Sequence, residues 1–283
     1  MRTHKDQQPT AWFAATLMVV FIAICATDAV AGVSQDSSAA LTPVQLKIER
    51  QRARLSSVEE EERRDAVSQL GAMHHPDAAR VAVSALKDPS PSVRATAASS
   101  ILDLPDEESA ANLIPLLSDK DEFVRREAAY ALGKTRSRSA VASLIERLLT
   151  DKQDGVRGAA AVALGDIADA SAVSTLAAVL SSQVVLTGSK KNSKSKKEQN
   201  PFVLRAAAHS LGQIGNRDAV PALIAALQNE KTEDDVRRES AGALGLIGDP
   251  SSIPALRLAV TAPDPYLSKA AHEAIQAILK LKS

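Results

Sequence analysis

Residues 123–133 read FVRREAAYALG, and close variants of this stretch recur along the chain. Copies of its beginning are found at 92–98 (SVRATAA), 155–161 (GVRGAAA), 202–208 (FVLRAAA), 235–241 (DVRRESA) and 266–271 (YLSKAA). The steps between their Val or Leu positions, from Val93 to Leu267, are 31, 32, 47, 33 and 31 residues. A period in the low thirties is typical of stacked structural repeats rather than of a single globular core.

The step of 47 residues exceeds the others by about half a repeat, which indicates an insertion around residues 184–200. A further copy is expected upstream, because Glu62 lies 31 residues before Val93 and residues 69–71 end in Leu-Gly like the other copies. The chain therefore contains about six or seven repeats.

Each repeat is expected to form two helices. The first has apolar residues on one face at the helical period, as in Val124, Ala128, Ala129 and Leu132. The glycine that follows, Gly133, is expected to end this helix in a left-handed conformation. The second helix follows a short turn, as at residues 217–228, where Pro221 lies in the first turn and disturbs no helical hydrogen bond.

Two local features add to this pattern. In the second repeat, Leu102 replaces the glycine and Pro115 falls in the middle of a helix, which predicts a kink or a shortened helix. At the start of the first repeat, Ser57 and Glu60 have the spacing of a capping box.

Composition favours an all-helical protein, and the net charge gives no global argument for nucleic acid or an anionic membrane as a partner. Aromatic residues make up 2% of the chain, so the core must be built from Ala, Leu, Val and Ile, a balance that suits close helix packing better than strands. Basic and acidic residues cancel at 34 each, which gives no overall electrostatic reason to expect nucleic acid as a partner.

The pattern D-x-x-x-x-V-R…A-A-x-A-L-G…A-V-P-x-L resembles the short bacterial HEAT-like repeats, often grouped with the phycobilisome-lyase HEAT-like repeats. The resemblance extends from about Ser57 to the C-terminus. It implies an all-α fold, an α-solenoid of two-helix repeats wound as a right-handed superhelix. The sequence marks of tetratricopeptide and ankyrin repeats are not found.

The resemblance also implies an Asp–Arg ladder that orients neighbouring repeats. The matching pairs are Asp88/Arg94, Asp119/Arg125 and Asp151/Arg157, each six residues apart, and Arg237 has the same place in a later repeat. The fork of an arginine suits turn carbonyls and a carboxylate. Leu204 replaces the arginine in the repeat after the insertion, so the stack is expected to bend or loosen there.

The N-terminus has the features of a secretory signal. Arg2 and Lys5 precede an apolar run at 11–27, and Ala29-Val30-Ala31 matches a small-x-small cleavage site. We expect a secreted or periplasmic protein that begins near Gly32; an uncleaved membrane anchor is the alternative. Cleavage would remove Cys25, the only cysteine, and with it disulfides and thiolate sites.

These observations predict five segments. They are a signal peptide at 1–31, an N-terminal extension and capping helix at 32–56, repeats 1–4 at 57–181, a lysine-rich insertion at 182–200, and repeats 5–7 with a C-terminal cap at 201–283. The insertion is expected to be disordered. Its lysines could make a weak contact with an anionic surface; they are Lys190, Lys191, Lys194, Lys196 and Lys197.

Catalytic and metal-binding residues are not indicated. His74 and His75 are expected in a turn, His209 on a helix surface, and His272 beside Glu273. The HEAT-repeat deoxyhypusine hydroxylases hold two irons through several His-Glu dipeptides, whereas this chain has one. Phosphate-binding loops and nucleophile motifs are also missing from the sequence. We therefore expect no enzyme activity, cofactor or metal.

The leading hypothesis is a monomeric, non-catalytic scaffold or adaptor outside the cytoplasm that binds a protein or peptide. Second helices are expected to line the concave side, where small or weakly polar residues would form a smooth groove. The residues predicted to contact the partner are Asn112, Ser143, Glu146, Arg147, Thr175 and Ala222. The alternatives are a bilin-lyase-like or oxidoreductase-like enzyme or accessory factor, and an inert spacer attached to the envelope.

Overall fold

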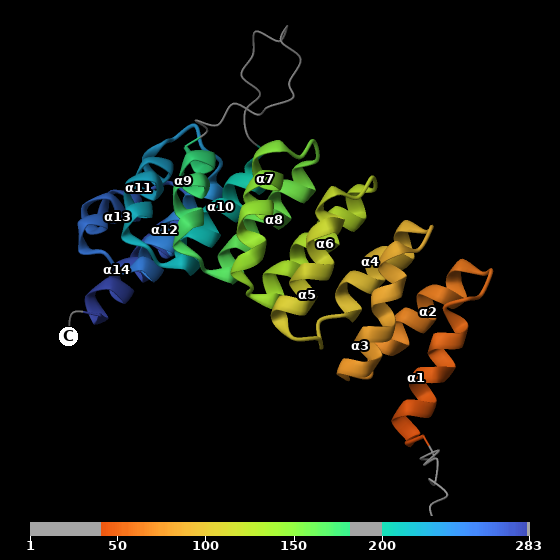
Figure 1. Cartoon of the computed structure of the whole chain (residues 1–283). Helices are drawn as coiled ribbons and strands as arrows, with labels where there is room; N and C mark the ends of the chain where they lie inside the picture. Colours follow the sequence, from red (N-terminus) through yellow and green to blue (C-terminus); the bar gives the residue numbers. More distant parts are fainter. Residues whose placement is uncertain (1–40, 182–199, 282–283) are drawn as a thin grey trace, which may run out of the picture. The chain divides into compact units, whose positions relative to one another are not determined.

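The computed structural model describes residues 41–181 and 200–281. The predicted leader and the five lysines of the insertion lie outside the described residues. The described part from Pro43 onward belongs to one compact unit. Within it every regular element is a helix, which confirms the predicted all-α class (Figure 1).

Each repeat has a first helix that carries the recurring Val-Arg motif or its variant. These first helices are α2 (Glu60–Gly71), α4 (Pro91–Ser100), α6 (Glu122–Thr135), α8 (Asp154–Ile167), α10 (Pro201–Ile214), α12 (Asp234–Ile247) and α14 (Pro265–Lys280). The second helices are α3 (Pro76–Ala82), α5 (Asp106–Leu113), α7 (Val141–Thr150), α9 (Val173–Leu180), α11 (Val220–Gln228) and α13 (Ile253–Val260), and α1 (Pro43–Arg54) precedes the first repeat.

Short 3-10 helices complete the second helices. In the first two repeats they follow the α-helix, as η1 (Val83–Lys87) and η2 (Ile114–Ser118). In the later repeats they precede it, as η3 (Arg138–Ala140), η4 (Ala170–Ala172), η5 (Arg217–Ala219) and η6 (Pro250–Ser252).

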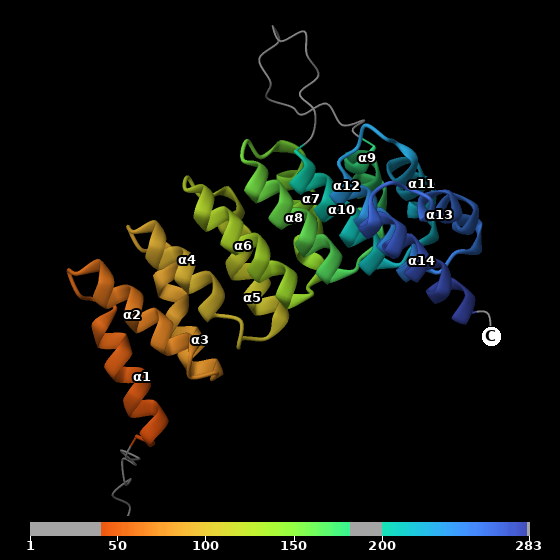
Figure 2. The same cartoon turned by 180° about the vertical axis from the view of Figure 1, so that it is seen from behind.

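The helices stack in sequence order as two layers. Each first helix packs against the next first helix and against a second helix beside it. The same order is visible from both sides in Figures 1 and 2. Because repeats contact mainly their neighbours, the described unit is the α-solenoid that the period predicts.

Small aliphatic side chains fill the space between the layers. In five of the first helices one leucine is fully buried at the same repeat position, among buried alanines. These leucines are Leu70, Leu132, Leu164, Leu211 and Leu244. Fully buried aromatic residues are not found in the described ranges, as the composition predicts.

The Leu-Gly glycine does not end the first helix. Helix α6 continues past Gly133 to Thr135, and the left-handed residue is Arg136, with φ of 52°. The left-handed residue stands three positions after the glycine in four further repeats, as His74, Ala168, Gly215 and Gly248. In α6 two residues, Lys134 and Thr135, lie between Gly133 and the left-handed residue that ends the helix. The prediction that Gly133 ends the helix was therefore wrong.

The glycine instead lets successive first helices approach closely. A Cβ atom on Gly133 would lie 2.9 Å from the Cα of Ala163, and one on Gly245 would lie 2.8 Å from the Cα of Ala274. Since carbon atoms do not approach to that distance without a shift of the backbone, a side chain at either position would push the two helices apart.

The second repeat departs as expected. Helix α4 has 10 residues, against 14 in α6, which confirms the shortened helix. Pro115 lies in the first turn of η2, where the α-helix gives way to a 3-10 helix. The first repeat makes the same change at Val83 without a proline, so Pro115 is not required for it.

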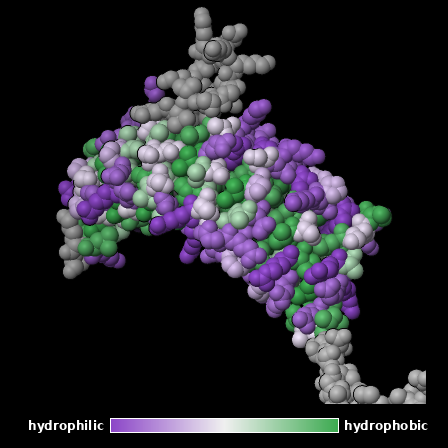
Figure 3. All heavy atoms as spheres, in the orientation of Figure 1, coloured by the Kyte–Doolittle hydropathy of each residue, from purple (hydrophilic) through white to green (hydrophobic). Residues whose placement is uncertain are grey.

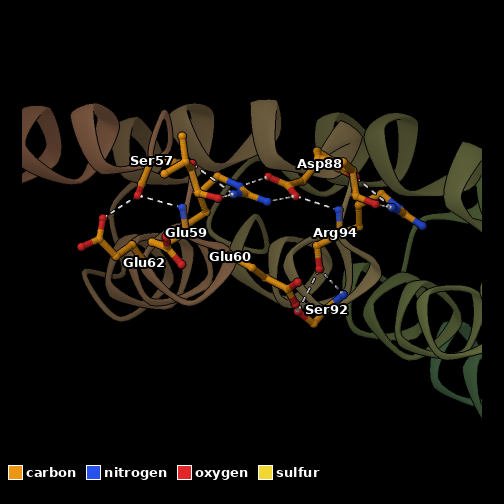
Figure 4. A network of polar contacts seen from close by, with 11 residues as sticks. Ser57, Glu59, Glu60, Glu62, Asp88, Ser92 and Arg94 are labelled. Carbon is orange, nitrogen blue, oxygen red and sulfur yellow. Dashed lines mark hydrogen bonds and ion pairs between the residues drawn. The ribbon is translucent and has the colours of Figure 1, made fainter.

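The predicted capping box is wrong. Helix α2 begins at Glu60, and its N-cap is Glu59. The hydroxyl of Ser57 accepts from the amide of Glu59 at 3.2 Å and donates to Glu62 at 2.5 Å, whereas Glu60 accepts from Ser92 of the next repeat (Figure 4).

In the described ranges no helix is both long and apolar enough to cross a bilayer.

Candidate functional site

A ladder of arginine–aspartate pairs joins the first four repeats. The Arg63 guanidinium donates to both carboxylate oxygens of Asp88, from Nε at 2.7 Å and from Nη2 at 2.9 Å. Arg94 binds Asp119 in the same way at 2.8 Å for both bonds, and Arg125 binds Asp151 at 2.8 and 3.0 Å. Each arginine therefore holds the carboxylate of the following repeat in a bidentate pair.

The carboxylate partners differ from the predicted pairs. Arg94 reaches the residue six positions before it through its backbone: Nη1 donates to the carbonyl oxygens of Asp88 at 2.8 Å and Pro89 at 3.1 Å (Figure 4). The carboxylate that it binds is 25 residues later. Arg125 likewise donates to the carbonyl oxygen of Asp119 at 3.0 Å. Each of these arginines thus clamps its own turn and the next turn together.

The predicted pairing of Arg157 with the Asp151 carboxylate is wrong. That carboxylate is bound by Arg125 of the preceding repeat. Arg157 reaches Asp151 only through the backbone, where Nη1 donates to the carbonyl oxygen at 3.4 Å. Nη2 of its guanidinium also lies 2.6 Å from the carboxylate of Asp154 on its own helix. The position 25 residues later falls in the insertion, outside the described residues, so the described ladder ends at Arg125.

The same carboxylates also order the turns in which they lie. Oδ1 of Asp119 accepts from the amide of Asp121 at 2.9 Å, and Oδ1 of Asp88 accepts from the amide of Ser90 at 2.9 Å. Burial by itself raises the pKa of Asp119. The hydrogen bonds from Arg94 and the Asp121 amide outweigh burial, so this pKa lies below its ordinary value of 3.8. The pKa values of Asp88 and Asp151 are lowered by the same balance.

The ladder does not continue in the last repeats as predicted. Arg237 donates to the carbonyl oxygen of Leu227 at 3.1 Å and to Asp234 of its own helix at 3.1 Å. The next repeat has Ala262 where the earlier repeats have the ladder aspartate. The neighbouring Arg238 instead binds Asp264, the N-cap of α14, at 2.8 Å.

The two helix layers are spaced differently. Successive first helices are in extensive contact, with backbones brought together at the glycines, whereas successive second helices touch at few points. A stack of repeats curves toward the layer in which its elements are closer. The first helices therefore line the inner side of this unit, and the prediction that the second helices line the concave side is wrong.

The residues predicted to contact a partner lie on the second helices, in the wider layer. Asn112, Ser143, Thr175 and Ala222 are half-buried there. The Asn112 amide donates to the carbonyl of Glu108 at 2.8 Å, and Arg147 forms an ion pair with the exposed Glu146.

The outward positions of the first helices form a surface that we call the first-helix face. In α6 its residues are Glu122, Phe123, Arg126, Glu127, Tyr130 and Lys134. The equivalent positions in α10 include Phe202, Arg205, His209 and Gln213, and those in α12 include Arg238, Glu239 and Leu246. In α14 they include Tyr266 and Lys269.

All four aromatic residues outside the predicted leader belong to this face. Phe123, Phe202 and Tyr266 are 44%, 39% and 68% exposed, and the fourth, Tyr130, is half-buried. An arginine lies over each of the three exposed rings: Arg126 is 4.9 Å from the Phe123 centroid, Arg205 is 6.0 Å from Phe202, and Arg238 is 5.4 Å from Tyr266. These are cation–π distances.

Two further features complete the face. His209 of α10 and Glu239 of α12 are 2.8 Å apart across one joint between repeats. Leu246 of α12 is 65% exposed. Figure 3 shows apolar and polar residues interspersed over the side of the unit that it presents.

The other histidines have local structural roles or are exposed. His74 is a left-handed residue after α2, and Nδ1 of His75 accepts from the Asp77 amide at 3.1 Å as the N-cap of α3. His272 is exposed on α14. Among the described residues, no group of three or more possible metal ligands is found.

Sequence reasoning missed Arg63 and the first-helix face. Arg63 stands 31 residues before Arg94, so the alignment that places the first repeat would have identified it. The aromatic residues were visible as the rare large side chains of an Ala-rich sequence. Their shared face follows once each is placed on the repeat.

Comparison with known proteins identifies the repeats. The solved structure of the Escherichia coli protein YibA is 20% identical, with 83% of this chain and 82% of that chain covered and a TM-score of 0.56. The complex of CpcE and CpcF of phycocyanin lyase from Nostoc is 22% identical, with 86% and 91% covered and a TM-score of 0.49. Human deoxyhypusine hydroxylase is 22% identical, with 82% and 84% covered and a TM-score of 0.41.

No curated protein matches the chain in sequence. The family model of HEAT repeats matches it at residues 49–132, 81–165, 110–186 and 194–276. These matches cover most of the chain and include every first helix from α2 to α12, with the greater part of α14. The chain belongs to the HEAT repeat family.

Proposed function

We propose that this protein is a non-catalytic scaffold that binds a partner protein through its first-helix face. The observation that carries the proposal is the placement of all four aromatic residues of segment 32–283 on that face, three of them exposed and covered by an arginine. The ring of Phe202 also packs against the neighbouring repeat, where it fills the space beside Gly158 of α8. Phe123 and Tyr266 are more exposed, at 44% and 68%, and are the rings most available to a partner.

The composition of the face suits protein recognition. Tyrosine and arginine are enriched among the residues that contribute most to binding energy at protein interfaces. A ring and a stacked guanidinium together offer a flat apolar surface with hydrogen-bond donors at its edge.

The place of action follows from the N-terminal sequence. The basic start, the apolar run at 11–27 and the small-x-small site at 29–31 support export from the cytoplasm. The scaffold would then meet its partner in the periplasm or outside the cell. Fractionation of the native organism, with mass spectrometry of the mature N-terminus, tests this part of the proposal.

The binding face is tested by proximity labelling with wild-type protein, followed by pull-down of the labelled proteins with purified variants. Arg126→Glu and Tyr266→Ala on the first-helix face are expected to weaken capture at least tenfold, since each removes an anchor of about 1.4 kcal/mol or more. The matched controls are Asn112→Arg and Thr175→Arg on the second helices, which should leave capture unchanged.

Circular dichroism and urea midpoints must show that all four variants are folded. Loss of capture in the second-helix variants together with full capture in the first-helix variants would refute the proposed face.

A further inference from the structure

One groove of the stack contains an arginine that lacks the bidentate carboxylate of the ladder arginines. It lies at the end of the repeats, between the C-termini of α11 and α13 and the start of α12. The residues that define it are Leu227, Arg237, Ala255, Leu258, Ala262 and Pro263.

An equivalent groove lies three repeats earlier, where its lining is charged. There Asp119, Arg125, Arg147, Asp151 and Lys152 surround the corresponding space. At matching repeat positions, Leu258 replaces Arg147, Ala262 replaces Asp151 and Pro263 replaces Lys152. The groove at the end of the stack is therefore the apolar form of a site that is otherwise charged.

Both grooves contain an arginine at the same repeat position, Arg125 in the earlier groove and Arg237 in the later one. The side chains of Arg125 and Arg237 are 14% and 15% exposed, so their guanidinium groups are equally withdrawn from water. Arg125 is neutralised by the bidentate carboxylate of Asp151. Among the described residues, Arg237 has one hydrogen bond to a carbonyl and one to Asp234, and its Nη2 has no partner.

The contact with Asp234 is a weak substitute for the ladder pair. Asp234 is on the same helix three residues earlier, its side chain is half exposed, and it accepts a single bond of 3.1 Å. Helix pairs of this kind contribute little, whereas a bidentate pair with a withdrawn guanidinium contributes much more. A further carboxylate is thus favoured at the position that Asp151 has in the earlier groove.

The residues around Arg237 indicate which kind of side chain lies next to the bound carboxylate. Leu258 is 67% exposed beside Ala262 and Pro263, so an aliphatic side chain next to the acidic one would cover apolar surface. Glu230 also lines the groove and disfavours a second negative charge on the ligand. Charge and shape together select a peptide with one acidic residue beside a large aliphatic residue.

We propose that this groove binds such an acidic–aliphatic peptide segment of a partner protein, whose carboxylate completes the ladder at Arg237. The inference rests on the proposed scaffold role and gives it a second contact point with a defined chemistry.

The test uses full-length protein and two fluorescein-labelled peptides, with the cores Leu-Asp-Leu and Leu-Asn-Leu in identical Gly-Ser flanks. Fluorescence anisotropy is expected to show at least tenfold tighter binding of the Asp peptide. Arg237→Gln should remove this preference. The matched control is Arg257→Gln, an exposed arginine of α13 outside the groove, which should keep it.

A second variant, Ala262→Asp, places a ladder carboxylate in the chain itself. It is expected to weaken binding of the Asp peptide at least tenfold and to raise the urea midpoint, because the new side chain occupies Arg237. Equal binding of the two peptides, binding of neither, or full binding by the Ala262→Asp variant would overturn the proposal. A dimer that forms in wild-type protein and is lost in Ala262→Asp would assign the groove to a second copy, which also overturns it.

The outcome is separable from that of the scaffold proposal. Capture of the partner that is lost in Arg126→Glu but retained in Ala262→Asp would support the first-helix face and reject the groove.

Discussion

The joints between repeats at the start and at the end of this solenoid are held by different means. From α2 to α8, arginine–aspartate clamps connect each turn to the next. From α10 to α14 the ladder positions hold Leu204, Lys231 and Ala262, and the first helices meet through glycines that bring their backbones together. An arginine–aspartate pair one residue off the ladder, Arg238 with Asp264, joins α12 to the start of α14. The joints between α2 and α4 and between α6 and α8 have both devices.

The repeat therefore specifies the helix pair more strictly than it specifies the joint between neighbouring pairs. A clamp fixes orientation through charge and hydrogen bonds and depends on solvent conditions. A close backbone approach depends on the absence of a side chain and hardly on pH. Changes aimed at one device should therefore leave the other half of the stack little affected.

The largest effect is expected from breaking a clamp. Asp151→Ala removes the carboxylate that neutralises the withdrawn Arg125 guanidinium and caps the turn at Gln153. Loss of one partner of a buried pair costs about 3 kcal/mol. Urea denaturation followed by circular dichroism measures this change.

The matched control for this clamp is Lys231→Ala, at the ladder position of a joint that has no clamp. It should change the free energy of unfolding by less than about 0.5 kcal/mol. A similar loss in both variants would mean that the ladder position matters for a reason other than its ion pair.

A smaller effect, of about 2 kcal/mol, is expected when a close approach is blocked by Gly245→Ala, since the new Cβ would meet the backbone of Ala274 at 2.8 Å. Gly242→Ala, three residues earlier on the same helix, is the control. No atom lies within 4 Å of its Cβ position, so the better helix propensity of alanine should stabilise the protein by about 1 kcal/mol.

Opposite signs for these two substitutions in thermal or urea unfolding would sharpen the distinction. Destabilisation by both would show that α12 tolerates no side chain at either glycine, in conflict with the open space at Gly242.

Protonation of the clamp carboxylates changes stability only in acid, so it has the smallest effect at neutral pH. The pKa values of Asp88, Asp119 and Asp151 are lowered in the folded protein, so their contribution to stability is present above the unfolded pKa of about 3.9 and is lost as pH falls through the folded values. Hydrogen exchange below pH 4 should show the helices α2–α6 losing protection before α10. The start of α14 is also acid-sensitive, because burial, which raises the pKa of Asp264, is outweighed by hydrogen bonds from Arg238 and two backbone amides, which lower it.

The variant Asp119→Asn should flatten this pH dependence because its amide does not titrate. An unchanged pH dependence in this variant would mean that other carboxyl groups set the acid stability.

Much of the fold follows from the sequence because its information is local and repeated. The period, the buried Val, Ala and Leu positions and the prolines of the second helices each depend on a few neighbouring residues. The residue types of the ladder were also predictable. Their carboxylate partners were not, since the reach of Arg94 to a residue 25 positions later depends on how two repeats pack. For the same reason the sequence did not show that Arg157, which has the ladder spacing, contacts Asp154 of its own helix.

Two predictions were wrong, the helix stop at Gly133 and the layer on the inner side of the curve, because both depend on how neighbouring repeats pack. Glycine serves both helix ends and close helix contacts, so Gly133 alone does not distinguish them; the left-handed Arg136 carries no glycine to mark it. The inner side of the curve depends on the relative spacing of two layers, a property of the assembled stack that no single repeat contains.

The clamps lie along one edge of the stack, where each first helix begins, whereas the left-handed residues lie where it ends. A 14-residue helix such as α6 separates these edges by about 21 Å. The row of clamps acts as a spine. Bending that opens the opposite edge can turn the repeats about the spine with the clamps intact, whereas bending that opens the spine must separate opposite charges. The clamped half of the solenoid should therefore resist bending more strongly in the direction that separates the ion pairs than in the opposite direction.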